Sequence, residues 1–195
     1  MQLVVRSNDQ VLARFANGLG ALGESRSRQV MARAINRTGG PTLTKVRREL
    51  ARATSAPMSI IRRQVVASKA YAGDGSIPGK LDFKIRATGN ALPLRVFRPV
   101  EFKFGVRARV WGRFQRFEGA FTRGGQFPDR VALAKGGGNV FARTGKGRLP
   151  IEKLFGPSLP KELIEDRIVQ VFDANIGRLG SDIAHELNRE LSKFS

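Results

Sequence analysis

The residues best suited to chemistry form a run of arginines and aromatic side chains between positions 107 and 117. The run reads Arg-Ala-Arg-Val-Trp-Gly-Arg-Phe-Gln-Arg-Phe. Guanidinium groups bind phosphate oxygens, and aromatic rings can stack on unpaired bases. We therefore predict a site for nucleic acid or another polyanion, made of Arg107, Arg109, Arg113, Arg116 and Arg123. The same run also fits an alternative: a strand whose aromatic side chains are buried in the core and whose arginines face solvent or an acidic partner.

Residues that could support catalysis are few. The single histidine, His185, has Glu186 beside it and Asp182 one helical turn away, but such charges are ordinary on a solvated helix face. The glycine-rich segment at 136–147 lacks the strand, loop and helix of a phosphate-binding loop. The absence of cysteine excludes thiolate metal sites and a thiol nucleophile. We therefore predict no catalytic residue, no metal, no cofactor and no enzymatic activity.

The charge of the chain favours a polyanionic partner. Lys and Arg number 35 against 16 Asp and Glu, a net charge of +19. The charge is +21 over residues 1–159 and −2 over residues 160–195. A cationic body attracts polyanions because binding releases their counterions. No apolar run approaches the length of a membrane span, so we expect a protein made in the cytoplasm and not bound to membrane.

Hydrophobic periodicity divides the chain into a helical and a β region. Residues 9–54 have helical spacing, and Gly39-Gly40-Pro41 should kink the helix or begin a new one. Apolar residues then alternate over 81–87 and 100–110, with a further strand expected at 92–96. Residues 112–147 are rich in glycine and basic residues, which predicts a long loop with short strands expected at 130–134 and 140–143. Ten of the thirteen phenylalanines lie between 83 and 155, which places the expected aromatic core in this β region.

The last 36 residues predict one long amphipathic helix, with Gly177 and Gly180 as points where it could break. Apolar residues hold one face for almost thirty residues, and at ~1.5 Å per residue the helix would exceed what a domain of this size needs. The stripe either packs on the sheet of its own chain or, in its distal part, on a neighbouring subunit. The predicted interface comprises Phe172, Ile176, Leu179, Ile183, Leu187 and Leu191.

These patterns predict one α+β domain. Helices at 1–70 and a long helix at 160–195 should pack on a mainly antiparallel sheet within 80–156, which also carries the extended basic loop. In a ring of subunits, the acidic C-terminal arm of one chain could lie on the cationic body of the next.

Two stretches resemble the minor tail protein Z family of long-tailed phages and prophages. The first is Ala-Ile-Asn-Arg-Thr at 34–38, followed by Lys-Val-Arg-Arg-Glu-Leu at 45–50. The second is Gly-Arg-Leu-Pro-Ile-Glu-Lys-Leu-Phe-Gly-Pro-Ser-Leu-Pro at 147–160, and Gly-Ala-Phe at 119–121 resembles a short motif of the same family. The resemblance spans about residues 30 to 190.

The resemblance implies a structural virion protein of tail completion, located at the head-proximal end of the tail. The implied partners are the tail terminator, the tape-measure protein and the leading end of the DNA, in a homo-oligomeric ring that would be six-fold if it matched a tail tube. The family has no catalytic residues to transfer. The charge supports a different class of protein equally well: a free nucleic-acid-binding protein without sequence preference.

Overall fold

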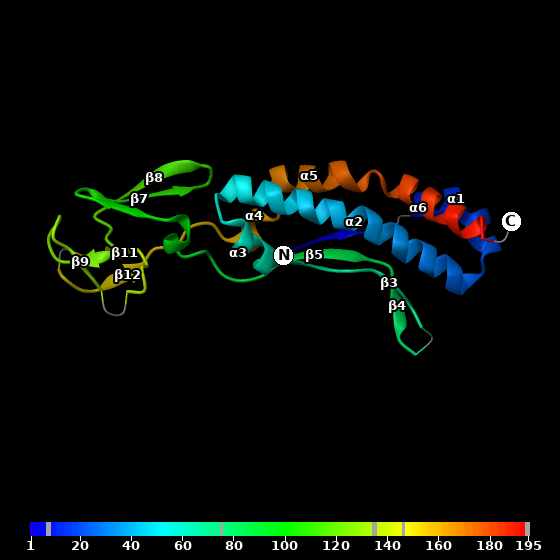
Figure 1. The fold of residues 1–195 in the computed structure, drawn as a ribbon, viewed down its shortest axis with the longest axis horizontal. Coiled ribbons are helices and arrows are strands. Elements are labelled where there is room, and N and C mark those ends of the chain that lie inside the picture. The colour runs from blue at the N-terminus through cyan, green and yellow to red at the C-terminus, as the bar shows by residue number, and fades with distance from the viewer. Residues whose placement is uncertain (7–8, 75, 134–135, 146, 194–195) are drawn as a thin grey trace.

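The computed structural model describes residues 1–6, 9–74, 76–133, 136–145 and 147–193, with the backbone alone at 9–12, 14 and 21. It is an elongated molecule with helices at one end and a group of short strands at the other (Figure 1). The predicted α+β fold with antiparallel sheets is confirmed. The helices are α1 (Asp9–Ala21), α2 (Glu24–Thr54), α3 (Met58–Gln64), α4 (Leu159–Glu162), α5 (Asp166–Ile176) and α6 (Leu179–Leu191).

Helix α2 is the spine of the helical half. Its 31 residues continue through Gly39, Gly40 and Pro41 as one helix, so the predicted alternative of a new helix beginning at Pro41 is wrong. Packing on α5, α6 and a sheet outweighs the hydrogen bond that proline removes. Gly39 also has a packing role, because a Cβ atom there would collide with the ring of Phe83.

The sheet under α2 has the strand order β1-β5-β2, with antiparallel neighbours. Its strands are β1 (Gln2–Val5), β5 (Phe83–Ala87) and β2 (Val65–Ser68). Phe83 and Ile85 are buried under α2, as the alternation at 81–87 predicts. A hairpin of β3 (Tyr71–Gly73) and β4 (Pro78–Lys80) projects from this half of the molecule (Figure 1).

The other end of the molecule, residues 92–157, is called the β head. It contains the 3-10 helix η1 (Leu94–Phe97) and the strands β6 (Val100–Phe102), β7 (Gly105–Val110), β8 (Arg113–Glu118), β9 (Arg123–Gly124), β10 (Val131–Ala132), β11 (Phe141–Arg143) and β12 (Ile151–Lys153). The predicted strand at 100–110 is two strands joined by a turn, and η1 occupies most of the strand predicted at 92–96. The long loop predicted at 112–147 carries β8 to β11.

The C-terminal helical segment returns along α2 in the opposite direction, divided into α4, α5 and α6. Phe172, Leu179, Ile183 and Leu187 are buried in the core of this chain. Ile176 and Leu191 are partly buried against the same core. The predicted use of this stripe as an oligomer interface is therefore corrected, because α2 of the same chain already covers it.

Ion pairs join α6 to α2 along the same contact. The Arg33 guanidinium lies 3.2 Å from Glu186 and also contacts Glu190, while Arg37 lies 3.3 Å from Asp182 and 3.4 Å from Glu186. All three carboxylates are buried. Lys193, with Arg33, holds the pKa of Glu190 below its ordinary value. The acidic arm thus lies on the cationic body of its own chain, and not on a neighbour as the ring hypothesis supposed.

We predict that replacing Arg37 with leucine lowers the free energy of unfolding by about 2 kcal/mol. This loss of stability is smaller than that for a fully buried ion pair, because Arg33 still contacts Glu186 and Arg178 still contacts Asp182 in the variant. Thermal denaturation should show a melting temperature lower by roughly 4 to 8 °C. Arg48→Leu is the matched control, since Arg48 is exposed on the same helix. Equal melting temperatures for the two variants would contradict the stabilising role of the ion pairs.

Candidate polyanion-binding face

The antiparallel sheet β6-β7-β8 presents one face to the core and one to solvent. Alternation along β7 buries Val106, Ala108 and Val110 and leaves Arg107 and Arg109 exposed. The pairing of β7 with β8 is continuous from 105 to 110, so the faces of the two strands are fixed relative to each other.

Strand register places further residues beside these two arginines. Arg116 is opposite Arg107 and Phe114 is opposite Arg109, while β6 brings Phe102 to the same side. Phe104, in the turn between β6 and β7, stacks on Phe102 with the ring centroids 5.3 Å apart. We call this surface the Arg–Phe face; its residues are Phe102, Phe104, Arg107, Arg109, Phe114 and Arg116.

Exposed phenylalanines correct the prediction of an aromatic core in the β region. Phe114 is 67% exposed and Phe104 is 40% exposed. Of the ten phenylalanines between 83 and 155, only Phe83 and Phe97 are buried. Most rings of the β head therefore lie at or near the surface, where they meet arginines.

Stacking on the rings orders the guanidinium groups. The Arg107 guanidinium lies 4.9 Å from the centroid of Phe102 and 5.2 Å from that of Phe114. Arg116 lies 5.2 Å from the centroid of Phe104. A guanidinium that stacks through its flat face keeps the N–H donors at its edge available. These arginines are thus held in place without using the donors that bind phosphate.

None of the five predicted arginines forms an ion pair with a carboxylate in the part of the chain that the structure describes. By contrast, Arg130 pairs with Glu101 within the same β head. Glu118, at the end of β8, is a carboxylate on the side of the Arg–Phe face. The β head as a whole carries 14 Lys and Arg against 4 Asp and Glu. Among the described residues, Glu118 forms no ion pair with the arginines of the face, so the face keeps an excess of positive charge.

The structure brings three of the five predicted arginines together and separates two. Arg107, Arg109 and Arg116 share the Arg–Phe face. Arg113 is opposite Val110, whose side chain is buried, so it belongs to the other side of the hairpin. Arg123 lies on β9, beside a neighbouring cleft.

Trp111, within the basic and aromatic run, anchors the hairpin. Its indole N–H donates to Glu162 at 2.8 Å, and its backbone N–H donates to the Thr54 carbonyl at 3.2 Å. The next residue, Gly112, donates its N–H to the Ser55 hydroxyl at 3.0 Å. The tip of the β7-β8 hairpin is thus fixed to the end of α2 and to α4, which sets the orientation of the Arg–Phe face.

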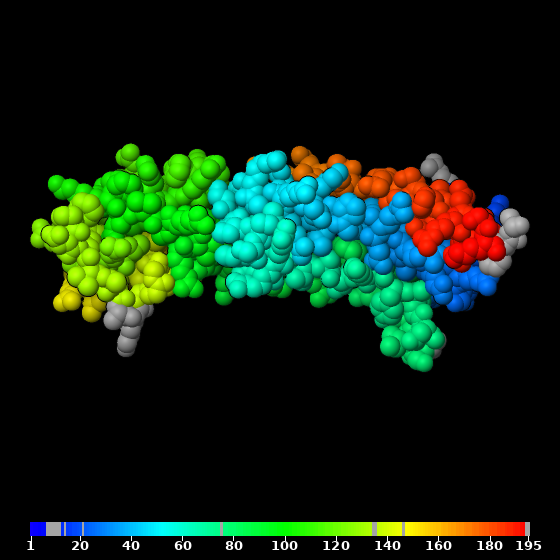
Figure 2. All heavy atoms as spheres, viewed as in Figure 1, coloured from blue at the N-terminus to red at the C-terminus, as the bar shows by residue number. Residues whose placement is uncertain are grey.

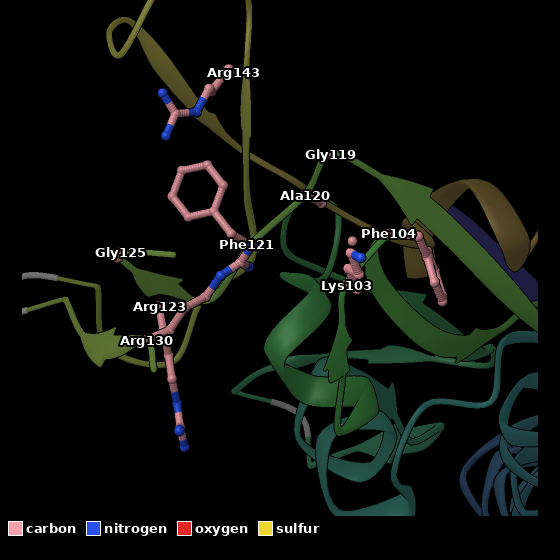
Figure 3. Close-up of a pocket in the computed structure, with 11 residues that line it drawn as sticks. Lys103, Phe104, Gly119, Ala120, Phe121, Arg123, Gly125, Arg130 and Arg143 are labelled. Atoms are coloured by element: carbon pink, nitrogen blue, oxygen red, sulfur yellow. The ribbon is translucent and has the colours of Figure 1, made fainter. Parts of the chain in front are cut away.

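The cleft beside the face is lined by basic side chains (Figure 3). Lys103, Arg123, Arg130 and Arg143 surround a volume of about 110 Å³, with Phe104 at its border. Pockets for small molecules are usually several times larger, about 300 Å³ or more. The sequence prediction included Arg123 but not Lys103, Arg130 or Arg143, because these residues come from separate segments of the chain. Only the general excess of basic residues pointed to them.

The structure does not bring the remaining candidates together. His185 is exposed, whereas Asp182 and Glu186 are buried against the arginines of α2. Among the described residues, no group of three His, Asp or Glu side chains could hold a metal ion. The described helices include none with both the length and the apolar character needed to cross a membrane. What this arrangement can do is bind an extended anion.

Comparisons with known proteins gave no match: a scan of family models, a search of curated proteins and a search of solved structures each found nothing similar. The function is therefore inferred from the residues and their geometry.

Proposed function

We propose that this chain is a non-enzymatic structural protein of a tailed-phage particle, which binds a polyanion through its Arg–Phe face. The observation that carries the binding activity is the set of three arginines on one exposed sheet face without carboxylate partners among the described residues, two of which, Arg107 and Arg116, are ordered by phenylalanine rings. The placement in a tail, near the end that joins the head, rests on the resemblance of 34–38 and 147–160 to minor tail proteins.

Both resembling stretches occupy structural joints. Residues 34–38 include Arg37 and Thr38, which contact the buried Asp182; the Thr38 hydroxyl donates to it at 2.7 Å. Gly156, in the second stretch, donates its N–H to the Leu92 carbonyl at 2.7 Å and so joins the first and last segments of the β head, next to the start of α4. The first motif thus holds α6 on α2 within the helical half, and the second lies where the β head meets the helices; an assembling particle protein requires both contacts to be fixed.

DNA is the polyanion that best fits this proposal. Binding through arginine and phosphate is independent of sequence, and it gains free energy from released counterions. An acidic segment of a tape-measure protein would satisfy the same charges. The proposed assembly is a homo-oligomeric ring, in contact with the tail terminator and the tape measure.

Subunit contacts in such a ring would not come from the buried C-terminal stripe. Exposed apolar side chains elsewhere could supply them, among them Ile77 on the β3-β4 hairpin and Val131 and Leu149 on the β head.

A second candidate is a free nucleic-acid-binding protein. The Arg–Phe face itself favours it, because binding through this face needs no other subunit. The two candidates differ in whether the chain is a permanent component of a particle.

The Arg–Phe face predicts a specific change in salt dependence. The double variant Arg107→Gln/Arg109→Gln should reduce the slope of log K against log salt for DNA by roughly 1.5, because each phosphate contact contributes ~0.7 to 0.9. The measurement is a titration of DNA affinity at several salt concentrations. The matched control is Arg62→Gln/Arg63→Gln, which removes the same charge from the exposed side of α3. An equal reduction in both variants would mean that only net charge matters and would remove the face from the binding site.

The location in a particle gives a separate prediction. Purified phage particles from the encoding genome should contain the chain by mass spectrometry, and antibody labelling should place it at the head-proximal end of the tail. Particles assembled without the gene should have tails that fail to join heads. A chain that is abundant in the lysate but absent from purified particles would favour the free nucleic-acid-binding protein instead.

A further inference from the structure

We infer that the β head prefers single-stranded nucleic acid to duplex, with bases stacked on the Arg–Phe face and backbone phosphate held in the adjoining cationic cleft. The inference rests on the proposed polyanion binding and names its substrate class. Its basis is the combination of exposed rings with ordered cations, since charge alone would serve duplex and single strand equally.

The exposed phenylalanine rings can stack on the bases of a single strand but not on those of a duplex. Phe114 leaves 67% of its surface exposed and Phe104 leaves 40%. In a duplex the bases stack on one another, so their flat faces are closed to a protein ring. In a single strand these faces are open, and stacking on phenylalanine is favourable for every base. Sheet faces that carry aromatic residues are an established way to bind unpaired bases.

Cations and rings are interspersed on the face. The Arg107 guanidinium of β7 lies 4.9 Å from the ring centroid of Phe102 on β6 and 5.2 Å from that of Phe114 on β8, its diagonal neighbours in the sheet. A single strand likewise places bases and phosphates close to one another. An acidic peptide would match the guanidiniums but not the rings, because the negative face of an aromatic ring repels carboxylate.

The cleft continues the face at Phe104. This side chain borders the cleft and also supports Arg116 of the face. Within the cleft, Arg130 is held by Glu101 and Arg143 lies 5.6 Å from the centroid of Phe121. Lys103 and Arg123 have no carboxylate partner among the residues described. A volume of about 110 Å³ equals that of about four waters, which suits a phosphate group rather than a whole nucleotide.

The test compares a fluorescent thymidine oligonucleotide of about 20 residues with a duplex of equal length at one salt concentration. The single strand should bind more tightly. Phe114→Leu should weaken single-strand binding by roughly 5- to 150-fold, the loss of one stacked base, and leave duplex binding unchanged. Because Phe114 is mostly exposed, the variant should fold, which circular dichroism would verify. Phe155→Leu is the matched control, since Phe155 is 50% exposed outside the Arg–Phe face.

The possible outcomes separate this inference from the proposed function. Equal affinity for both nucleic acids, with no effect of Phe114→Leu, would overturn the single-strand preference and leave polyanion binding through the arginines intact. Binding to polyglutamate but to neither nucleic acid would overturn the inference and the choice of DNA as the polyanion. Failure to bind any of the three probes would overturn polyanion binding itself.

Discussion

Three carboxylates on α6 are buried against α2, and each must meet a positive charge there, because an unpaired buried carboxylate costs several kcal/mol. Asp182, Glu186 and Glu190 recur every four residues, so they lie along one side of the helix facing Arg33 and Arg37. This requirement sets the position of α6 along α2, while Arg167 paired with Glu49 sets that of α5. The orientation of the β head follows, because α4 precedes α5 and its Glu162 accepts the Trp111 N–H.

The same arrangement separates charge along the molecule. Carboxylates of the C-terminal segment are used within the helical half, where they neutralise arginines of α2. The β head holds 14 basic residues beside 4 acidic ones, a net charge of +10 over 66 residues against +9 over the other 129, so positive charge is densest at this end of the elongated body (Figure 2). A polyanion is therefore attracted to that end, and the helical half with its projecting hairpin is left for other contacts.

Sequence patterns predicted the α+β class, the antiparallel β region and the basic run, because periodicity and composition report on these directly. They did not predict where strands reverse. Because the turn after Val110 contains two residues, the outward-facing residues are odd-numbered on β7 and even-numbered on β8. Arg116 therefore shares the Arg–Phe face with Arg107, whereas Arg113 does not. The continuity of α2 through Pro41 was also hidden, since it depends on packing by segments far away in the sequence. The cationic cleft depends in the same way on contacts between β6, β9 and β11.

The exposed phenylalanines show why composition alone misplaced the aromatic core. A phenylalanine is normally buried because its apolar surface avoids water, but a guanidinium stacked on its ring covers part of that surface and gains a favourable cation–π contact. Arg107 and Phe114 thereby stabilise each other at the surface. The same contact restricts the arginine before any ligand arrives, so less side-chain entropy is lost when phosphate binds. An Arg–Phe face held by the Trp111 anchor is thus preorganised for an extended anion, which a mobile basic loop of equal charge would not be.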